Sequence, residues 1–260
     1  MKGIILAGGN GTRLRPLTSA VSKQLLPIFN KPLVYYPLST LMLAGIKEIL
    51  VIVKKGDLGV FRSLLGDGSQ WGISLSFLEQ FEPKGIAQGL IIGEEFLAGD
   101  GCAYILGDNF FYGTGLGRTL SNFNPVHGAQ IFAYEVSNPS DYGVVEMNEV
   151  NQIISIEEKP STPKSNFAIT GLYFFDKHAP DLAKKIIPSG RNELEITDLI
   201  RLYLSQKQLR VTVLPRGTAW LDTGTFEGLQ DAGTFVRIIE ERQGMKVGDP
   251  GEISRLKGWT

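Results

Sequence analysis

Short apolar runs alternate with helical patterns in the first half of the chain, and this alternation constrains the fold more than any other feature. Each run is bounded by turn residues, which is typical of strands covered on both faces of a mainly parallel sheet. The strand-like runs are residues 3–6, 49–53, 75–78 and 103–106, and the helical patterns between them are residues 32–44, 57–65 and 86–97. Because parallel strands need right-handed crossovers, the order predicts an α/β fold with a doubly wound sheet.

The second half of the chain has a different pattern of apolar and polar residues. Its strand-like segments partly alternate between apolar and polar residues, which favours antiparallel or mixed pairing. These segments are residues 130–135, 143–146, 152–156 and 169–175, followed by helical patterns at 180–187, 195–205 and 226–243. We therefore expect a single domain with an inserted mixed-sheet lobe.

Charge and cysteine content exclude several classes of partner. The chain has 260 residues and a formal net charge of −1, so it lacks the basic surface that nucleic acid or an anionic membrane would require. No apolar run approaches the ~18 residues of a membrane span, and the N-terminus lacks a secretory h-region. Cys102 is the only cysteine, which excludes an intrachain disulfide and predicts a core position. We expect a cytoplasmic protein that binds small molecules.

A glycine-rich turn follows the first strand-like run, in the sequence from Leu6 to Leu14. Such turns let the backbone approach a phosphate closely at the carboxyl end of a strand. The dinucleotide fingerprint fails, because Leu14 stands where the third glycine belongs, and no Gly-Lys-Ser/Thr closes a P-loop. Arg13, Arg15 and Lys23 follow within a few residues. Glycines combined with arginine and lysine indicate a polyphosphate site.

Residues 8–18 together with 23–27 resemble the signature of the sugar-nucleotide pyrophosphorylases. The resemblance extends in order over nearly the whole chain, through residues 31–38, 106–109, 142–145, 156–160, 170–174, 193–198 and 220–225. It implies a Rossmann-like mixed sheet of the nucleotide-diphospho-sugar transferase type. A domain over residues 1–240 would then have a nucleotide-binding half at about 1–110 and a sugar-binding half at about 111–225, with a short extension at 241–260.

The resemblance also implies a reaction. An oxygen of a sugar 1-phosphate would attack the α-phosphorus of a nucleoside triphosphate, in line with departing pyrophosphate and without a covalent enzyme intermediate. The most similar pattern within the family joins dTTP to α-D-glucose 1-phosphate and gives dTDP-glucose. Mg²⁺ is the implied cofactor, and a homo-oligomer, either a dimer or a tetramer, is the implied assembly.

Five residues match the family's catalytic positions. Arg13 and Lys23 would hold the triphosphate and stabilise the leaving pyrophosphate. Asp108 and Asp222 would bind Mg²⁺, a hard cation that takes few carboxylates and keeps phosphate and water ligands. Lys159 would neutralise the sugar phosphate.

Further residues match binding positions of the family. The implied nucleotide-binding set is Leu6, Gly8, Gly9, Gly11, Thr12, Arg13, Lys23, Gln24, Gln80, Gly85 and Asp108, and the implied sugar-binding set is Asn109, Gly143, Glu158, Lys159 and Ile169. Gln80 and Gly85 correspond to the loop that recognises the base. An amide can both donate and accept, which fits the N3–H and O4 edge of thymine or uracil.

Two histidines and an aromatic run are also conspicuous, but they do not indicate a catalytic site. His127 and His178 stand apart in the sequence, which argues against a histidine-based metal site or triad. The aromatic run from Tyr173 to Phe175 predicts sheet core. Several alternatives stay open: UTP or N-acetylglucosamine 1-phosphate as substrate, a non-catalytic regulatory subunit that binds nucleotide sugars, and an NAD-dependent oxidoreductase, which the broken fingerprint disfavours.

Two departures from the family pattern concern specificity and control. Residues 85–90 differ from the commonest form of this segment, in which Leu and Phe are frequent. Longer members carry about one more pair of helices after the position of Thr260, associated with an inhibitor site and subunit contacts. The sequence therefore leaves open the sugar preference, feedback control by a downstream dTDP-sugar, and the tetramer.

Overall fold

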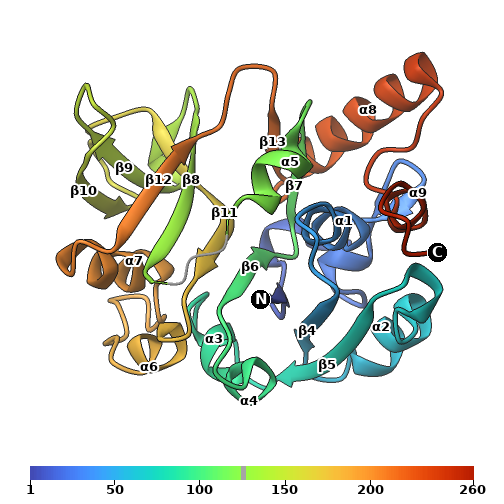
Figure 1. Cartoon of the computed structure of the whole chain (residues 1–260), viewed down its shortest axis with the longest axis horizontal. Coiled ribbons are helices and arrows are strands. Elements are labelled where there is room, and N and C mark those ends of the chain that lie inside the picture. The colour runs from blue at the N-terminus through green and yellow to red at the C-terminus, as the bar shows by residue number, and fades with distance from the viewer. Residues whose placement is uncertain (124–126) are drawn as a thin grey trace. The chain divides into compact units, whose positions relative to one another are not determined.

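The chain forms two compact units in the computed structural model, which describes residues 1–123 and 127–260. The terminal unit comprises Lys2–Pro83, Ile105–Asn122 and Gly217–Thr260. The middle unit comprises Met1, Lys84–Tyr104 and Phe123–Arg216. Figure 1 shows the elements of both units, with the chain coloured from its N-terminus to its C-terminus.

A parallel sheet organises the terminal unit. Strand β1 (Lys2–Ala7) pairs with β4 (Glu48–Lys54), and β4 pairs with β5 (Ser74–Gln80). Ile4, Ile5 and the residues from Ile49 to Val53 have no exposed surface, because helices cover the sheet. Helix α1 (Tyr35–Leu43) contacts β1, and α2 (Leu58–Leu65) contacts β4 and β5. The parallel strands expected from continuous apolar runs are thus confirmed.

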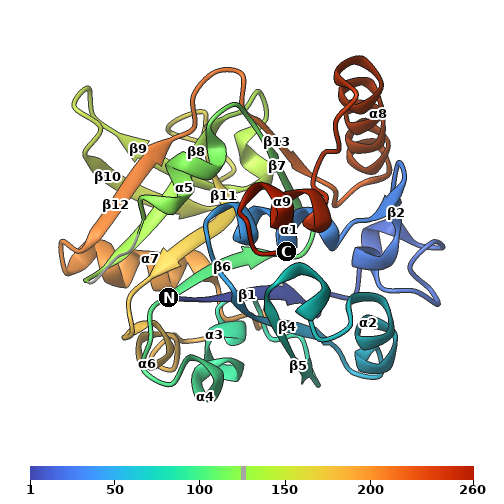
Figure 2. The same ribbon diagram turned by 45° about the vertical axis from the view of Figure 1, so that its right-hand side comes forward.

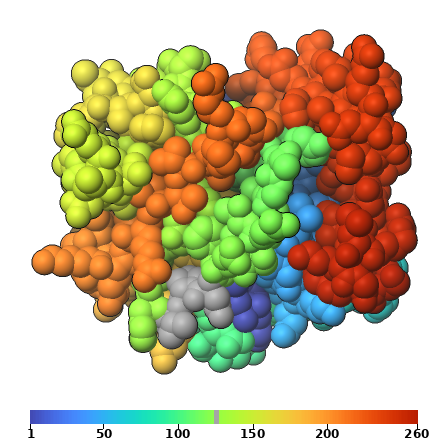
Figure 3. All heavy atoms as spheres, turned by 45° about the horizontal axis from the view of Figure 1, so that its top comes forward, coloured from blue at the N-terminus to red at the C-terminus, as the bar shows by residue number. Residues whose placement is uncertain are grey.

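Shorter elements complete the terminal unit. They are the hairpin strands β2 (Pro27–Ile28) and β3 (Lys31–Pro32), the antiparallel strands β7 (Asn109–Tyr112) and β13 (Ala219–Asp222), and helices α5 (Leu116–Ser121), α8 (Phe226–Gln243) and α9 (Pro250–Leu256). Helix α9 packs beside α1, as Figure 2 shows. Figure 3 shows residues of α8 and α9, drawn in red, at the surface.

A mixed sheet organises the middle unit. Its long strand β11 (Phe167–Phe175) pairs antiparallel with β8 (Ala129–Glu135) and with β9 (Gly143–Met147). Strand β10 (Ile153–Glu158) pairs antiparallel with β9, and β12 (Leu209–Val213) pairs parallel with β8. The remaining elements are β6 (Cys102–Leu106), most of which belongs to this unit, and helices α3 (Gln88–Ile92), α4 (Glu94–Leu97), α6 (Ala179–Ala183) and α7 (Ile196–Ser205).

Three helix predictions were wrong in their bounds. The segment 86–97 forms two short helices, because the glycine at position 93 has ψ of −1° and separates α3 from α4. The helix expected from Pro32 begins only at Tyr35, since Pro32 pairs with Pro27 in the hairpin. The helix expected over 180–187 ends at Ala183, and the Lys185 and Ile186 N–H groups then donate to carbonyls three residues back instead of four.

Asp176 is a buried carboxylate in the core of the middle unit. Asp176 accepts hydrogen bonds from the Tyr203 hydroxyl at 2.7 Å, the Gly128 N–H at 2.7 Å and the His178 N–H at 3.0 Å. Cys102 is fully buried, and burial together with the charge of Asp176 raises the pKa of its thiol to about 12. The thiol is therefore protonated at neutral pH, which agrees with the predicted core role.

Aromatic packing continues this core. Tyr173 stacks on Phe175 at 5.8 Å between ring centroids, and Phe175 stacks on Tyr203 at the same distance. Tyr173, Phe174 and Phe175 are all buried, as predicted. Among residues 1–123 and 127–260, no helix has both the length and the apolar character needed to cross a membrane.

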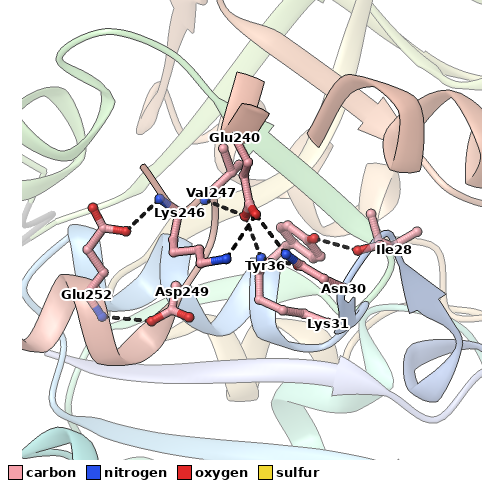
Figure 4. Close-up of polar contacts among 9 residues, drawn as sticks. All are labelled: Ile28, Asn30, Lys31, Tyr36, Glu240, Lys246, Val247, Asp249 and Glu252. Atoms are coloured by element: carbon pink, nitrogen blue, oxygen red, sulfur yellow. Dashed lines mark hydrogen bonds and ion pairs between the residues drawn. The ribbon is translucent and has the colours of Figure 1, made fainter. Parts of the chain in front are cut away.

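Glu240 of α8 connects three segments of the terminal unit, as Figure 4 shows. One carboxylate oxygen accepts from Lys31 Nζ at 2.7 Å and from the Val247 N–H at 2.9 Å, and the other accepts from Asn30 Nδ2 at 2.7 Å. The side chains of Lys31 and Glu240 are only 8% and 6% exposed. Burial alone would raise the pKa of Glu240, but the donors outweigh it and lower the pKa to about 2. The ion pair thereby fixes the β2–β3 hairpin against α8.

We predict that Glu240→Gln destabilises the terminal unit in a pH-dependent way. The variant leaves Lys31 buried without its counter-charge and should lose about 3 kcal/mol of unfolding free energy at pH 7. Because the folded-state pKa lies below the ordinary value of 4.5, the Glu240 contribution is fully present above about pH 4.5. The difference between wild type and variant should therefore shrink as pH falls from 4.5 toward 2, in urea unfolding at a series of pH values.

The matched control is Glu241→Gln on the same helix. Glu241 is exposed and pairs with Arg237 at 2.9 Å across one helical turn, so the change should cost well under ~1 kcal/mol. An equal loss in both variants, or a pH-independent loss in Glu240→Gln, would contradict the assignment.

Candidate nucleotide and sugar phosphate sites

The glycine-rich turn after β1 is closed by local hydrogen bonds. Gly11 has φ of 57°, and its carbonyl accepts from the Leu14 N–H at 3.0 Å and from the Thr18 hydroxyl at 2.7 Å. Leu14 is fully buried and anchors the turn, whereas Thr12 and Arg13 are exposed. Residues 12–14 form a single 3₁₀ turn. The loop therefore carries the Arg13 side chain on a backbone that is fixed on the core.

Lys23 and Asp108 form a buried ion pair in the same unit. The Lys23 ammonium donates to Asp108 Oδ2, and the two side chains are 10% and 18% exposed. Burial pushes the pKa of Asp108 upward, but the charge and hydrogen bond of Lys23, with a hydrogen bond from Asn109, hold it below its ordinary value. Asp108 is therefore ionised at neutral pH.

Pairing of β7 with β13 brings Asp222 close to Asp108. In the register of the two strands Asp222 lies opposite Asn109, and the Thr223 N–H and hydroxyl both donate to the Asp108 carbonyl, at 3.3 and 2.9 Å. Burial and then the charge of Asp108 raise the pKa of Asp222 to about 6, against the opposing charges of Lys23 and Arg13. Two neighbouring carboxylates thus share one site.

The donor set of this site suits a hard divalent cation. Mg²⁺ binds oxygen ligands, commonly one or two carboxylates, and takes its remaining ligands from substrate phosphates and water. Asp108 and Asp222 supply two carboxylates whose mutual repulsion a divalent cation would relieve. Among residues 1–123 and 127–260 there is no cluster of three or more His, Cys, Asp or Glu side chains that could hold a metal ion. A cation at this pair would therefore keep positions free for phosphate.

Two buried glutamines lie near the carboxyl end of β1. A Cβ added to Gly8 would meet Gln80 Oε1 at 1.9 Å, so Gly8 makes room for that amide. Gln80 ends β5 and is 2% exposed. Gln24 is equally buried, and its Oε1 has no hydrogen-bond partner among the described residues. Because a buried acceptor without a partner is costly, Gln24 is a candidate for a ligand contact.

Asn109 plays a supporting part in the terminal unit. Its Oδ1 accepts from Trp220 Nε1 at 2.6 Å, and its Nδ2 donates to Asp108 Oδ1 at 3.1 Å. The amide is 3% exposed. Asn109 therefore links Trp220 of β13 to Asp108 by hydrogen bonds. It is also one of the residues that the family resemblance assigns to sugar binding.

A second cluster lies in the middle unit, around Gly143. A Cβ added to Gly143 would lie 2.9 Å from Thr197 Cγ2, 3.4 Å from Glu158 Oε2 and 3.8 Å from Ile169 Cδ1. Gly143 and Glu158 are direct partners in the β9–β10 pairing. Thr197 is buried, and its hydroxyl has no hydrogen-bond partner among the described residues. This cluster places a carboxylate and a hydroxyl beside a glycine. Both groups can form hydrogen bonds with the hydroxyl groups of a sugar.

Arg191 orients the carboxylate of this cluster. Its Nη2 donates to Glu158 Oε1 and to Glu195 Oε1, both at 2.9 Å. Glu195 is 5% exposed and also accepts from the Ser189 hydroxyl at 2.7 Å. Arg191 is itself exposed, so it connects the buried carboxylate of Glu195 with the surface of the middle unit.

Gly85 and Lys159 are further predicted site residues in the middle unit. Gly85 has φ of 104°, and an added Cβ would lie 2.4 Å from the Leu194 nitrogen, so only glycine fits. Lys159 is exposed with φ of 43°, and its N–H donates to the Tyr142 carbonyl at 3.0 Å. Its side chain is therefore presented by a fixed backbone.

The sequence-predicted residues thus fall into two sets. The terminal unit holds Leu6, Gly8, Gly9, Gly11, Thr12, Arg13, Lys23, Gln24, Gln80, Asp108, Asn109 and Asp222, and the middle unit holds Gly85, Gly143, Glu158, Lys159 and Ile169. Sequence reasoning missed Arg191 and Thr197. Thr197 lies inside the 193–198 block that carried part of the family resemblance, and that block was the available signal.

Comparisons with known proteins agree with this chemistry. A family model described as "Nucleotidyl transferase" matches residues 2–238. A glucose-1-phosphate thymidylyltransferase of Mycolicibacterium smegmatis is 57% identical over 259 residues, covering 100% of this chain and 90% of the relative. The enzyme of the same name from Neisseria meningitidis is 54% identical over 260 residues with the same coverage.

Solved structures are similar in fold. A chain from Bacillus anthracis, named as a glucose-1-phosphate thymidylyltransferase in complex with sucrose, has a TM-score of 0.84 and 38% identity, over 91% of this chain and 95% of that one. A UDP-glucose pyrophosphorylase complexed with UDP-glucose has a TM-score of 0.77 at 24% identity, over 91% of this chain and 98% of that one, which supports the fold alone. With a family model spanning residues 2–238 and relatives above 50% identity over the whole chain, this protein belongs to the nucleotidyl transferase family.

Proposed function

We propose that the chain condenses dTTP with α-D-glucose 1-phosphate to give dTDP-glucose and pyrophosphate. The observation that carries the reaction class is the juxtaposition of Asp108 and Asp222 with Lys23 beside the glycine turn that bears Arg13. The choice of dTTP and glucose 1-phosphate rests on the name of the relatives that are 57% and 54% identical over the whole chain.

The chemistry divides between binding and charge neutralisation. A phosphate oxygen of the sugar 1-phosphate attacks the α-phosphorus, and the bond from that phosphorus to the bridging oxygen of pyrophosphate breaks. Arg13 and Lys23 would neutralise the charge that grows on the leaving pyrophosphate. Mg²⁺ bound by Asp108 and Asp222 would supply further positive charge at the phosphates.

The middle unit would hold the sugar phosphate. Lys159 is an exposed cation suited to the phosphate, and Glu158 with Thr197 offers an acceptor and a hydroxyl to sugar oxygens. Arg191 would keep Glu158 in place through its hydrogen bond of 2.9 Å. For the base, the buried amides of Gln80 and Gln24 fit the N3–H and O4 edge of thymine.

The remaining expectations for the chain are a homo-oligomer and a cytoplasmic location. Both follow from composition and from the family resemblance, and both stay predictions. UTP or N-acetylglucosamine 1-phosphate remains the nearest alternative substrate, because residues 85–90 depart from the common family form.

A grid assay tests the proposed function directly. The chain is incubated with Mg²⁺ and each pair drawn from dTTP or UTP and glucose 1-phosphate or N-acetylglucosamine 1-phosphate, and pyrophosphate release is measured. We expect the highest kcat/KM for dTTP with glucose 1-phosphate, and no release when either substrate is omitted. Higher kcat/KM for another pair would reassign the substrate. Nucleotide-sugar binding without turnover on any pair would favour the non-catalytic alternative.

We predict that Asp222→Asn lowers kcat roughly 100-fold or more with little effect on folding, because it removes charge from the metal site and not core packing. The measurement is kcat over a range of Mg²⁺ concentrations, with thermal unfolding alongside. Asp231→Asn, which changes an exposed aspartate of α8, is the control and should retain wild-type kcat. Near-normal turnover of Asp222→Asn at limiting Mg²⁺ would rule out the metal role.

We predict that Lys159→Met raises the KM for glucose 1-phosphate roughly 10- to 100-fold, the loss expected when a charged hydrogen-bond donor is removed. The KM for dTTP should change little, because Lys159 is assigned only to the sugar phosphate. Lys164→Met is the control, since Lys164 is exposed and pairs with Glu157 at 2.7 Å. A rise confined to the KM for dTTP would reverse the assignment of Lys159.

A further inference from the structure

Gly224 lies in the turn between β13 and α8, two residues after Asp222, and is buried. A Cβ added to it would lie 2.8 Å from Arg13 Nη2, 3.3 Å from Arg13 Cζ and 3.1 Å from Asp222 Oδ1. The first of these distances is too short for any real Cβ contact. The end of the Arg13 side chain therefore occupies the space where residue 224 would carry a side chain.

The backbone of Gly224 does not require glycine. Its φ lies outside the left-handed region, unlike those of Gly11 and Gly85. The glycine is thus explained by the space that Arg13 occupies and not by an unusual conformation. The Gly224 N–H also donates a hydrogen bond to the Asp222 carboxylate. Residue 224 therefore contacts both a predicted pyrophosphate ligand and a predicted metal ligand.

We propose that Gly224 is a positioning residue, whose missing side chain lets the Arg13 guanidinium lie against the Asp222 end of β13 and face the leaving pyrophosphate. This inference rests on the proposed function, because it assigns Arg13 to that leaving group. A methyl group at residue 224 would displace the flexible end of Arg13 and press more weakly on Asp222 Oδ1, and none of its three nearest contacts is a backbone atom.

The neighbouring Gly228 provides a contrasting case. A Cβ there would lie 2.5 Å from the Asp222 carbonyl oxygen, which is backbone. Gly228→Ala must therefore move α8 or the end of β13, and it should destabilise the fold. Gly59 of α2 has nothing within 4 Å of an added Cβ and φ outside the left-handed region, so Gly59→Ala is a neutral control.

The test compares Gly224→Ala with Arg13→Ala, the double variant, Gly59→Ala and Gly228→Ala in the full-length chain. We expect Gly224→Ala to lower kcat about tenfold or more and to weaken pyrophosphate binding, measured by calorimetry without Mg²⁺, by a similar factor. Its Tm should match or exceed that of wild type, since replacing a glycine that has ordinary backbone angles restricts the unfolded chain. Gly228→Ala should lower the Tm, and Gly59→Ala should keep wild-type kcat and pyrophosphate affinity with a Tm equal to or above that of wild type.

The double variant decides whether Gly224 acts through Arg13. If it does, adding Gly224→Ala to Arg13→Ala produces no further loss of kcat or of pyrophosphate affinity. Losses that multiply in the double variant would overturn the proposal, as would Gly224→Ala with wild-type kcat and pyrophosphate affinity. A wild-type chain that releases no pyrophosphate from any substrate pair would refute the proposed function instead, and the calorimetric comparison would still decide the placement of Arg13.

Discussion

Repulsion between two neighbouring carboxylates is the constraint on which the terminal unit depends. Asp108 and Asp222 would separate if each were free to move, because burial strengthens the interaction of like charges. The hydrogen bonds from Thr223 to the Asp108 carbonyl and the pairing of β7 with β13 keep them together. Lys23 and Arg13 then offset part of the negative charge. The fold thus holds an electrostatic arrangement that favours a cation and phosphates.

Glycines supply the space in which the polar side chains of both units sit. Gly8 accommodates Gln80, Gly143 accommodates Thr197 beside Glu158, and Gly224 accommodates Arg13. Gly11 and Gly85 differ from these three, because their positive φ values make glycine a requirement of the backbone itself. Glycines near a site can therefore be sorted into those that shape the chain and those that make room for a neighbour. The backbone φ and the space around an added Cβ together separate the two kinds.

Sequence patterns predicted the long elements well and the short ones poorly. Apolar runs identified β1, β4 and β11, because strands buried on both faces are continuously apolar, whereas β5 alternates between buried and exposed residues. Strands β7 and β13 were missed, since four residues carry too little pattern and their pairing joins distant parts of the chain. Helix 86–97 was predicted as one element because a single glycine does not reveal from sequence whether it interrupts a helix.

The residues of the candidate site also divide into those that the sequence indicated and those that it did not. The glycine turn with Arg13 and Lys23 could be interpreted from residue chemistry, whereas Asp108 and Asp222 required the family resemblance. Arg191 had no sequence signal and Thr197 had only the 193–198 block, because the contacts of these residues with Glu158 and Gly143 are not encoded by any spacing. The resemblance implied a division near residue 110, but nothing in the sequence indicated that Gly85 would fall in the middle unit and Asp222 in the terminal unit.

The contact between Thr223 and Asp108 joins positions 115 residues apart in the chain. During synthesis on a ribosome, Asp108 would therefore emerge long before the strand that carries Asp222. A nascent chain that ends before β13 can complete the parallel sheet of β1, β4 and β5 but cannot assemble the paired carboxylates. The paired carboxylates therefore arise only after β13 has been synthesised, and a chain terminated before this strand would lack the candidate cation site.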